Sequence, residues 1–431
     1  MVNRIRVLSV CSSDSSGGAA QAAYRIHQAV RMYGIDSKMF VKEKKRDEED
    51  ILPLRNFVPD NLVYNAFDWI RNKCKNKWQH YVWGKYPERL SFYMSDLRST
   101  DIGDALRKID YDILHLHWIN NRFIPLEKLP KDKPIVWTLH DSWPFCGTCH
   151  YFLDCDNYLT GCGYCPQLRS GKERDLSRKI CLKKQRLYKG LDIHVVTPSR
   201  WLGESSAKSF LFRDKPVTVI PNCLDYETFK PISQTELSPR MRDLKNKFNG
   251  KTIIAFGAVN PSTDRIKGST ILARALQILA DVKHDEQLAL VVFGTDTPIA
   301  GFPESIPAYY AGYLDKTEDL VSLYNIASIV AVPSYTEVFG QVASEALSCG
   351  TPVVAFRCTG IQDVVTEDCG YLADPYSAEH FAEGILWCID KNKDGHLSSN
   401  ARTRVLNLYT SDIVGGLYSS LYKSLIKCSI A

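Results

Sequence analysis

Short apolar segments alternate with helical segments along almost the whole chain, and this alternation constrains the fold more than any other feature of the sequence. The segments are apolar throughout rather than at every second position, which is typical of strands buried on both faces of a parallel sheet. They form two series and predict two doubly wound α/β domains. The predicted strands are residues 5–10, 37–41, 113–117, 135–139, 194–197 and 217–220, followed by 252–256, 288–293, 328–332, 353–356 and 370–373.

The boundary between the two series is expected within residues 230–251, where prolines and a run of charged residues interrupt the apolar pattern. We therefore place the first domain at residues 1–231 and the second at residues 232–411, with residues 232–250 as a linker and lead-in helix. The length of 431 residues is ample for two large buried cores.

Composition and charge are those of an ordinary globular protein, with 45% hydrophobic and 24% charged residues. The net charge of +5 falls well short of what a nucleic-acid binder carries, so we expect no nucleic-acid partner. The first ten residues include Arg4 and Arg6 and lack the apolar core of a signal peptide. No run of 18 uncharged apolar residues is present, so we predict a cytoplasmic protein.

Two glycines open the first predicted helix. Gly17 and Gly18 follow the first strand and a serine-rich segment, and they precede a helix expected over residues 19–32. A glycine turn between a strand and a helix lets backbone N–H groups approach an anion, which makes Gly18 a candidate donor-binding residue. The alternative is a tight turn without a ligand, and the dinucleotide fingerprint G-x-G-x-x-G is absent.

The most informative string is SYTEVFGQVASEALSCGTPVV, at residues 334–354. Glu337 lies in the loop after a predicted strand, and Glu345 lies inside the following helix, separated from Glu337 by seven residues. One carboxylate can bind sugar hydroxyls and the other ribose hydroxyls, while the N–H groups of Val338, Phe339 and Gly340 point at a diphosphate. A single glutamate at a helix start is more often a cap, but the whole string favours a nucleotide-sugar site.

These residues resemble the retaining glycosyltransferases of the family 4 type (glycosyl transferases group 1). The resemblance rests on the E-x7-E spacing and on the strings PSYTEVFGQVASEALSCGTPVVA, VIPNCLDYETFKP and DRIKGSTILARAL, and it extends over both domains. It implies the GT-B fold, in which two Rossmann-like domains face a deep cleft. The first domain would bind the acceptor, the second would bind the nucleotide sugar, and a final helix at residues 412–431 would pack back on the first domain.

The resemblance also implies roles for single residues. Glu337 is assigned to catalysis and Glu345 to donor binding, and Lys267 in its K-G pair would bind the donor diphosphate. Many relatives carry an arginine directly after the glycine that ends the first strand of the second domain, whereas here Ala258 stands at that position. Arg265 is therefore the candidate for the second positive charge. Outside this motif, a lysine is normally a solvated surface residue.

Histidines follow two neighbouring strands, in the strings ILHLHW and TLHDSWP. His140 lies at the carboxyl end of its strand, where ligands bind in open α/β sheets. In similar enzymes a histidine at this strand end faces the reacting sugar and acceptor, so we predict that His140 is catalytic. A hydrogen-bonded loop histidine is the alternative. We leave His115 and His117 out of the candidate site because they could equally be core residues.

A cysteine-rich insertion at residues 143–168 contains the string CGTCHYFLDCDNYLTGCGYCP. Its two C-x2-C pairs suit a tetrahedral structural zinc site, although five thiols and His150 compete for four positions. The alternative is a set of free buried thiols. In similar proteins four of the five cysteines recur, and these are the ligands we predict for a structural Zn²⁺: Cys149, Cys155, Cys162 and Cys165.

No divalent metal is expected at the donor diphosphate. The Asp-x-Asp pair at residues 110–112 leads into a buried strand, and the pair at residues 154–156 lies inside the cysteine-rich insertion. Neither position suits a phosphate site. We predict that Lys267 and a helix dipole neutralise the diphosphate instead.

Residues 64–92 combine six basic and two acidic side chains with eight aromatic ones. Such a segment suits docking on an anionic membrane surface, where a lipid-linked acceptor would be found. The alternative is a solvated helix face over an aromatic core. The aromatic residues are Tyr64, Phe67, Trp69, Trp78, Tyr81, Trp83, Tyr86 and Phe92.

Together these features predict a retaining glycosyltransferase that moves a hexosyl unit from a UDP- or GDP-sugar to a glycan or polyprenyl-diphosphate-linked acceptor in surface polysaccharide biosynthesis. Peripheral attachment to the inner face of the plasma membrane is the further expectation. Two alternatives are a GT-B retaining phosphorylase and a catalytically silent nucleotide-binding subunit of the same fold.

Overall fold

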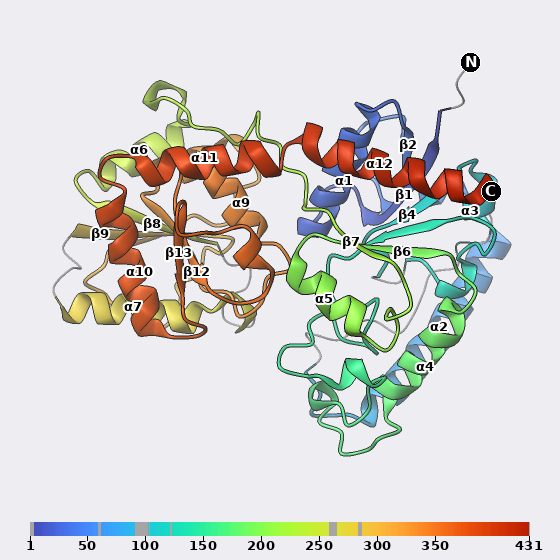
Figure 1. The fold of residues 1–431 in the computed structure, drawn as a ribbon. Coiled ribbons are helices and arrows are strands. Elements are labelled where there is room, and N and C mark those ends of the chain that lie inside the picture. The colour runs from blue at the N-terminus through green and yellow to red at the C-terminus, as the bar shows by residue number, and fades with distance from the viewer. Residues whose placement is uncertain are drawn as a thin grey trace. The chain divides into compact units, whose positions relative to one another are not determined.

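The structure is a computed structural model that describes residues 4–58, 62–90, 102, 104–120, 123–257, 265–282 and 287–430. The chain divides into two compact units (Figure 1). Unit 1 consists of Met1–Cys223 together with Ser411–Ala431, and unit 2 consists of Leu224–Thr410.

Unit 1 is built on a seven-stranded sheet in which all neighbouring strands are parallel. The strand order is β3-β2-β1-β4-β5-β6-β7, so the direction of winding reverses between β1 and β4. Ligands of such sheets bind at the carboxyl ends of the strands beside this reversal. The strands are β1 (Arg6–Ser13), β2 (Asp36–Glu43), β3 (Ile51–Pro53), β4 (Ile113–Leu116), β5 (Ile135–Thr138), β6 (Ile193–Thr197) and β7 (Val217–Val219).

The longer helices of unit 1 come from both ends of the chain. They are α1 (Gly18–Arg31), α2 (Leu62–Gly84), α4 (Leu176–Tyr188), α5 (Arg200–Lys208) and α12 (Ser411–Ile430), with a single turn at α3 (Ala105–Lys108). Helix α12 lies along α1 (Figure 1), and a Cβ atom at Gly415 would stand 2.6 Å from the carbonyl oxygen of Ala29. Only glycine therefore allows these two helices to approach so closely.

Unit 2 contains a six-stranded parallel sheet of the same kind. Its order is β10-β9-β8-β11-β12-β13, so the winding reverses between β8 and β11. The strands are β8 (Thr252–Gly257), β9 (Leu288–Phe293), β10 (Ala308–Tyr310), β11 (Ile329–Val332), β12 (Val353–Phe356) and β13 (Gly370–Ala373).

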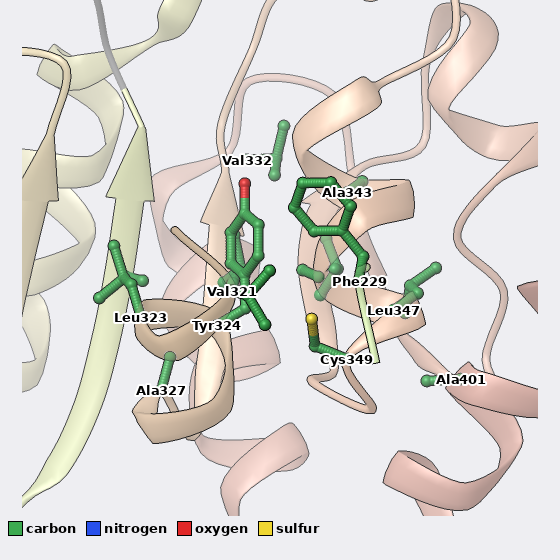
Figure 2. Close-up of a cluster of buried hydrophobic side chains, with 14 of the residues drawn as sticks. Phe229, Val321, Leu323, Tyr324, Ala327, Val332, Ala343, Leu347, Cys349 and Ala401 are labelled. Atoms are coloured by element: carbon green, nitrogen blue, oxygen red, sulfur yellow. The ribbon is translucent and has the colours of Figure 1, made fainter. Parts of the chain in front are cut away.

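Apolar clusters fill both faces of the unit 2 sheet. Helices α7 (Ser269–Asp281) and α10 (Ala378–Lys391) cover one face. The other face packs against α6 (Pro239–Lys247), α8 (Thr317–Ile326), α9 (Gln341–Ser348) and α11 (His396–Leu408). Figure 2 shows part of this second cluster, in which Tyr324 of α8 and Leu347 of α9 lie near Phe229. Strands buried on both faces explain why their sequences are apolar throughout.

The predicted fold class is confirmed, and every predicted strand is present with its ends moved by a few residues at most. The sequence analysis missed β3 and β10, which have three residues each and lie at the sheet edges. It also assigned residues 224–231 to the first domain, whereas the structure places them in unit 2, where Phe229 is buried. Residues 232–250, interpreted as a linker and lead-in helix, contain α6, whose Met241 is buried in the core of unit 2.

Candidate active site

In unit 2, two segments meet at the carboxyl ends of β8 and β11. One is a 3-10 turn, η7 (Arg265–Lys267), which ends in Gly268; the other follows β11 from Pro333 onward. Gly268 has a φ of +69°, and a Cβ atom there would stand 1.8 Å from the carbonyl oxygen of Pro333. The glycine of the K-G pair thus permits the contact that brings Lys267 to this edge.

Lys267 and Glu337 form an ion pair across that contact. The Lys267 ammonium lies 2.7 Å from Oε1 of Glu337, and Ser334 Oγ donates to the same oxygen at 2.8 Å. The Lys267 side chain is 34% exposed and that of Glu337 is 16% exposed. The backbone of Glu337 is fixed as well, because its N–H donates to Thr359 Oγ1 and its carbonyl accepts from the N–H of Gly360. Ser334 and Thr359 are supporting residues that the sequence analysis did not identify.

Helix α9 begins at this edge without a capping side chain. Its N-cap is Gly340, with a φ of +96°, and its first turn carries no acidic residue. The Phe339 side chain is buried and packs edge-on against Tyr409, so only its backbone is available to a ligand. Val338 is half-buried. The positive end of a helix dipole therefore stands beside the ammonium of Lys267, an arrangement that favours an anion.

Glu345 lies in the second turn of α9 and is 8% exposed. Burial, with a further contribution from the Glu345 carboxylate, raises the pKa of the Cys349 thiol to about 12. Arg265 is exposed, and no side chain within the described residues pairs with it. The segment that contains Ala258 lies outside the residues that the structure describes.

In unit 1, helix α1 also begins with glycine at the carboxyl end of β1. Gly17 is the N-cap, with a φ of +85° and no capping side chain, and Gly18 is the first helical residue. The preceding turn is closed by Ser13 Oγ, which accepts from the N–H groups of Ser15 and Ser16. The position that requires glycine is therefore Gly17, one residue before the candidate Gly18.

His140 follows β5 at the same edge of unit 1. Its Nε2 atom lies 3.0 Å from Nδ1 of His117, which follows β4. Burial lowers the pKa of His140 to about 4, so the imidazole is neutral near pH 7. The sequence analysis left His117, the residue at this distance from His140, out of the candidate site.

Asp141, the next residue, is fixed by three groups. Its carboxylate accepts from Trp118 Nε1 at 2.7 Å and from the N–H of Trp143 at 2.9 Å, and it lies 2.6 Å from Nδ1 of His150. His150 belongs to the cysteine-rich insertion. The insertion is therefore connected directly to the loop that carries His140.

The cysteine-rich insertion folds tightly in the structure. Its five cysteines line one small cavity of about 20 Å³ together with aromatic and polar side chains. Left-handed backbone at Gly161, Cys162 and Gly163 turns the chain, and a Cβ atom at Gly163 would stand 2.3 Å from the carbonyl oxygen of Glu173. A sixth cysteine, Cys181 of α4, shares a hydrogen bond with Cys162. The spacing analysis missed Cys181 because it lies on a helix outside the motif.

These cysteines are free thiols in the structure. Among the residues that are described, no three His, Cys, Asp or Glu side chains are arranged as a metal-ligand group. Zinc bound by Cys149, Cys155, Cys162 and Cys165 therefore stays a prediction.

The first Asp-x-Asp pair lies at the opposite edge of the unit 1 sheet from His140. Asp112 accepts from Arg6 through the backbone N–H at 2.8 Å and through the guanidinium at 2.6 Å, and Asp110 pairs with the same guanidinium. Arg6 is the first residue of β1, so this cluster marks the amino ends of the strands.

Helix α2 carries part of the basic and aromatic segment. Trp69, Trp78 and Tyr81 are at least half exposed, and the ammonium groups of Lys73 and Lys85 lie over the rings of Trp69 and Tyr81. Trp83, which the sequence analysis counted with them, is buried with Leu168 and Leu176 instead. The side chains of Tyr64, Phe67 and Phe92 lie outside the described residues. No helix in the described ranges is long and apolar enough to cross a bilayer.

Comparison with known proteins identifies the family of each half of the chain. Residues 16–228 match the family described as Glycosyltransferase Family 4, and residues 262–404 match the family described as Glycosyl transferases group 1. The D-inositol 3-phosphate glycosyltransferase of Corynebacterium jeikeium is 29% identical over 293 residues, which are 64% of this chain and 64% of that protein. A putative colanic acid biosynthesis glycosyl transferase of Escherichia coli is 24% identical over 280 residues, 61% of this chain and 62% of that protein. The chain thus spans less than two thirds of the length of these curated relatives.

Solved structures share the fold at low sequence identity. Anabaena HepE in complex with UDP-glucose has a TM-score of 0.62 at 16% identity, covering 98% of this chain and 100% of that chain. Sucrose-phosphate synthase from Thermosynechococcus elongatus has a TM-score of 0.60 at 17% identity, covering 99% and 100%.

Two parallel-sheet domains, each with a reversal in its strand order, define a GT-B fold. The matches to the two families add the finer assignment. The chain belongs to the glycosyltransferases that join a family 4 domain to a group 1 domain.

Proposed function

We propose that this protein transfers a hexosyl unit from a nucleotide sugar to a hydroxyl group of a glycan or lipid-linked acceptor, with retention of configuration at the anomeric carbon. The observation that carries the proposal is the Lys267–Glu337 pair beside the uncapped start of α9. An ammonium, a helix amino end and a carboxylate at one strand edge suit a diphosphate linked to a sugar.

In this proposal the donor binds to unit 2. Lys267 and the first-turn N–H groups at Gly340 hold the diphosphate, with Arg265 as a second cation. Glu345 accepts from ribose hydroxyls, and Glu337 accepts from sugar hydroxyls. A divalent metal is not required, since the ammonium and the helix dipole supply the positive charge that the leaving diphosphate needs.

The favoured base is uracil, because HepE, a protein of the same fold, binds UDP-glucose. GDP-sugars are the second group to test. Surface polysaccharide biosynthesis is the proposed setting, since a relative from Escherichia coli is described as a colanic acid biosynthesis transferase.

His140 is the proposed catalytic residue of unit 1, and it acts on the reacting sugar or the acceptor hydroxyl. As a neutral imidazole, it offers a hydrogen bond without an added charge. No nucleophilic side chain is invoked, so the reaction relies on positioning of the two substrates and on stabilisation of the departing diphosphate.

Membrane contact through α2 extends this proposal to the acceptor. Exposed Trp69, Trp78 and Tyr81 alternate with lysines on a helix, which suits the interface of an anionic bilayer. A cytoplasmic enzyme held on the inner membrane face would meet a polyprenyl-diphosphate-linked acceptor there. The test is sedimentation with anionic and neutral vesicles, and Trp69→Ser combined with Tyr81→Ser should abolish binding to the anionic ones.

The function is tested by a thermal-shift screen of UDP-, GDP- and ADP-sugars, followed by a transfer assay with the donor that binds. A ligand at 100 times its dissociation constant stabilises the folded state by about 2.7 kcal/mol, enough to identify the donor. Transfer should continue after brief treatment with EDTA. His140→Ala should lower turnover by about a hundredfold or more and leave donor affinity unchanged.

Two outcomes would replace the proposal. Sugar transfer that depends on inorganic phosphate and needs no nucleotide would indicate a phosphorylase. Donor binding without transfer or hydrolysis, with every acceptor offered, would indicate a silent subunit.

A further inference from the structure

Three histidines are stacked behind the candidate active-site edge of unit 1. His115 and His117 come from β4 and its carboxyl end, and His140 follows the neighbouring strand β5. The rings of His115 and His117 have centroids 4.1 Å apart, and those of His117 and His140 are 5.3 Å apart and nearly parallel. His115 and His117 are 1% and 2% exposed, so bulk solvent does not reach their rings.

Both nitrogens of the innermost histidine are occupied. His115 Nδ1 lies 2.7 Å from the hydroxyl of Tyr422, and its Nε2 lies 2.8 Å from Thr138 Oγ1. Thr138 Oγ1 also lies 2.8 Å from the hydroxyl of Tyr418. The His115 ring is therefore held by β5 and by α12, and it has no nitrogen left for His117.

The imidazole ring of the middle histidine has one hydrogen-bond partner among the described residues. His117 Nδ1 lies 3.0 Å from His140 Nε2, whereas its Nε2 is buried and has no partner within the described structure. A neutral imidazole carries one proton, so His117 places either an N–H or a lone pair at that unpartnered position.

The choice between these two states follows from the cost of burial. A buried N–H group without an acceptor is rarer in proteins than an acceptor without a donor. The proton of His117 therefore belongs on Nδ1, where it can be donated to Nε2 of His140. That nitrogen of His140 must then carry the lone pair, and its own proton must lie on Nδ1.

We propose that His117 is a positioning residue that fixes His140 as the Nδ1–H tautomer, with this N–H free to donate to an oxygen of the substrate. The inference rests on the proposed transferase function of His140, and it specifies that Nδ1–H is the group of His140 that donates to the substrate. Burial lowers the pKa of both residues, which keeps the pair neutral near pH 7.

The tautomer can be measured without any substrate. Protein labelled with ¹⁵N in histidine gives long-range ¹H–¹⁵N correlations whose pattern distinguishes the Nδ1–H from the Nε2–H form, and His140→Gln assigns the His140 signals. The expected result is Nδ1–H for both His117 and His140 at pH 7. An Nε2–H pattern for His140, or a mixture of both forms, would overturn the proposal.

Kinetics separate positioning from packing. His117→Asn places an amide N–H close to the position of Nδ1, whereas His117→Leu fills the space without a donor. The expected result is a turnover close to the parental rate for the asparagine variant and a loss of about tenfold or more for the leucine variant, with unchanged KM for the donor. His194→Gln, at a half-buried histidine of β6 that contacts Thr218, is the matched control.

A purely structural His117 predicts a different result. The leucine variant would then keep its turnover, and its melting temperature would stay equal or rise because the unpartnered nitrogen is gone. The proposed function fails separately, if the parental protein transfers no sugar while the tautomer is as expected.

Discussion

In unit 2, the ammonium group of Lys267 lies 2.7 Å from Oε1 of Glu337, a residue 70 positions further along the chain. A diphosphate that bound to Lys267 would enter beside the carboxylate of Glu337. We therefore expect the two side chains to have opposite effects on nucleotide affinity, although they form an ion pair with each other in this structure.

The first prediction concerns this pair. Lys267→Ala should weaken UDP binding about tenfold to a hundredfold, because a charged hydrogen bond contributes about 1.5–3 kcal/mol. Glu337→Gln should keep or improve UDP affinity, since it removes a negative charge next to the phosphates, yet it should lower turnover. Calorimetry with UDP checks both. Lys316→Ala, which removes an exposed lysine paired with Glu318, is the control. Parental affinity in Lys267→Ala would refute the assignment.

The second prediction concerns Glu345. If its carboxylate accepts from a ribose hydroxyl, Glu345→Ala should weaken UDP binding about tenfold to a hundredfold. It should also remove the preference for UDP over 2′-deoxy-UDP, because the two nucleotides then lack the same contact. A thermal melt of the variant shows whether it is folded. A variant that still distinguishes the two nucleotides as the parent does would mean that Glu345 does not bind the 2′-hydroxyl.

The third prediction concerns the cysteine-rich insertion. If four of its thiolates hold a structural Zn²⁺, the purified protein should contain about one zinc per chain. Cys162→Ser combined with Cys165→Ser should remove the metal and lower thermal stability, whereas Cys146→Ser should retain the metal. Cys74→Ser, at an exposed cysteine of α2, is the control. Metal-free protein with full stability would contradict the prediction.

The fourth prediction concerns acid. Burial lowers the pKa of His115 from 6.5 to about 3. The unfolded chain binds a proton at His115 below about pH 6.5, whereas the folded protein binds it only near pH 3. The free energy of unfolding must therefore decrease as the pH falls from about 6.5 to about 3. At pH 5 the loss from His115 alone is about 2 kcal/mol. Urea unfolding at pH 7 and pH 5 measures this loss of stability. His115→Gln should make the free energies of unfolding at the two pH values more similar. If the variant shows the same pH dependence as the parent, His115 is not the cause of the loss.

Much of the fold could be predicted because a strand buried on both faces must be apolar along its whole length. The strands at 288–293, 353–356 and 370–373 were predicted with the bounds that the structure shows. The edge strands β3 and β10 could not be predicted, since three residues are too short to display a pattern. Residues 224–231 were assigned to the first domain because Pro231 interrupts the apolar pattern, whereas Leu224 and Phe229 are buried in the core of unit 2.

The candidate site was predicted in part, as far as short motifs allow. Strings such as the K-G pair and the E-x7-E spacing indicate which residues gather at a strand edge, but contacts between distant segments depend on the register of the sheets. The contact of His117 with His140 joins two strands, and that of Cys162 with Cys181 joins a loop to a helix. Burial of Trp83 likewise depends on the packing of α2 against the cysteine-rich insertion, and the sequence of α2 alone does not indicate this packing.

The joining of α12 to unit 1 has a consequence for how the protein is made. Val414, Tyr418 and Tyr422 of this helix complete the apolar cluster that α1 shares with β1, and Tyr422 is the partner of His115. All of unit 2 is translated before these residues leave the ribosome. Unit 2 can therefore fold first, as a continuous segment, while the apolar face of α1 stays exposed until α12 packs against it. We therefore expect the nascent chain to be most prone to aggregation before α12 emerges from the ribosome.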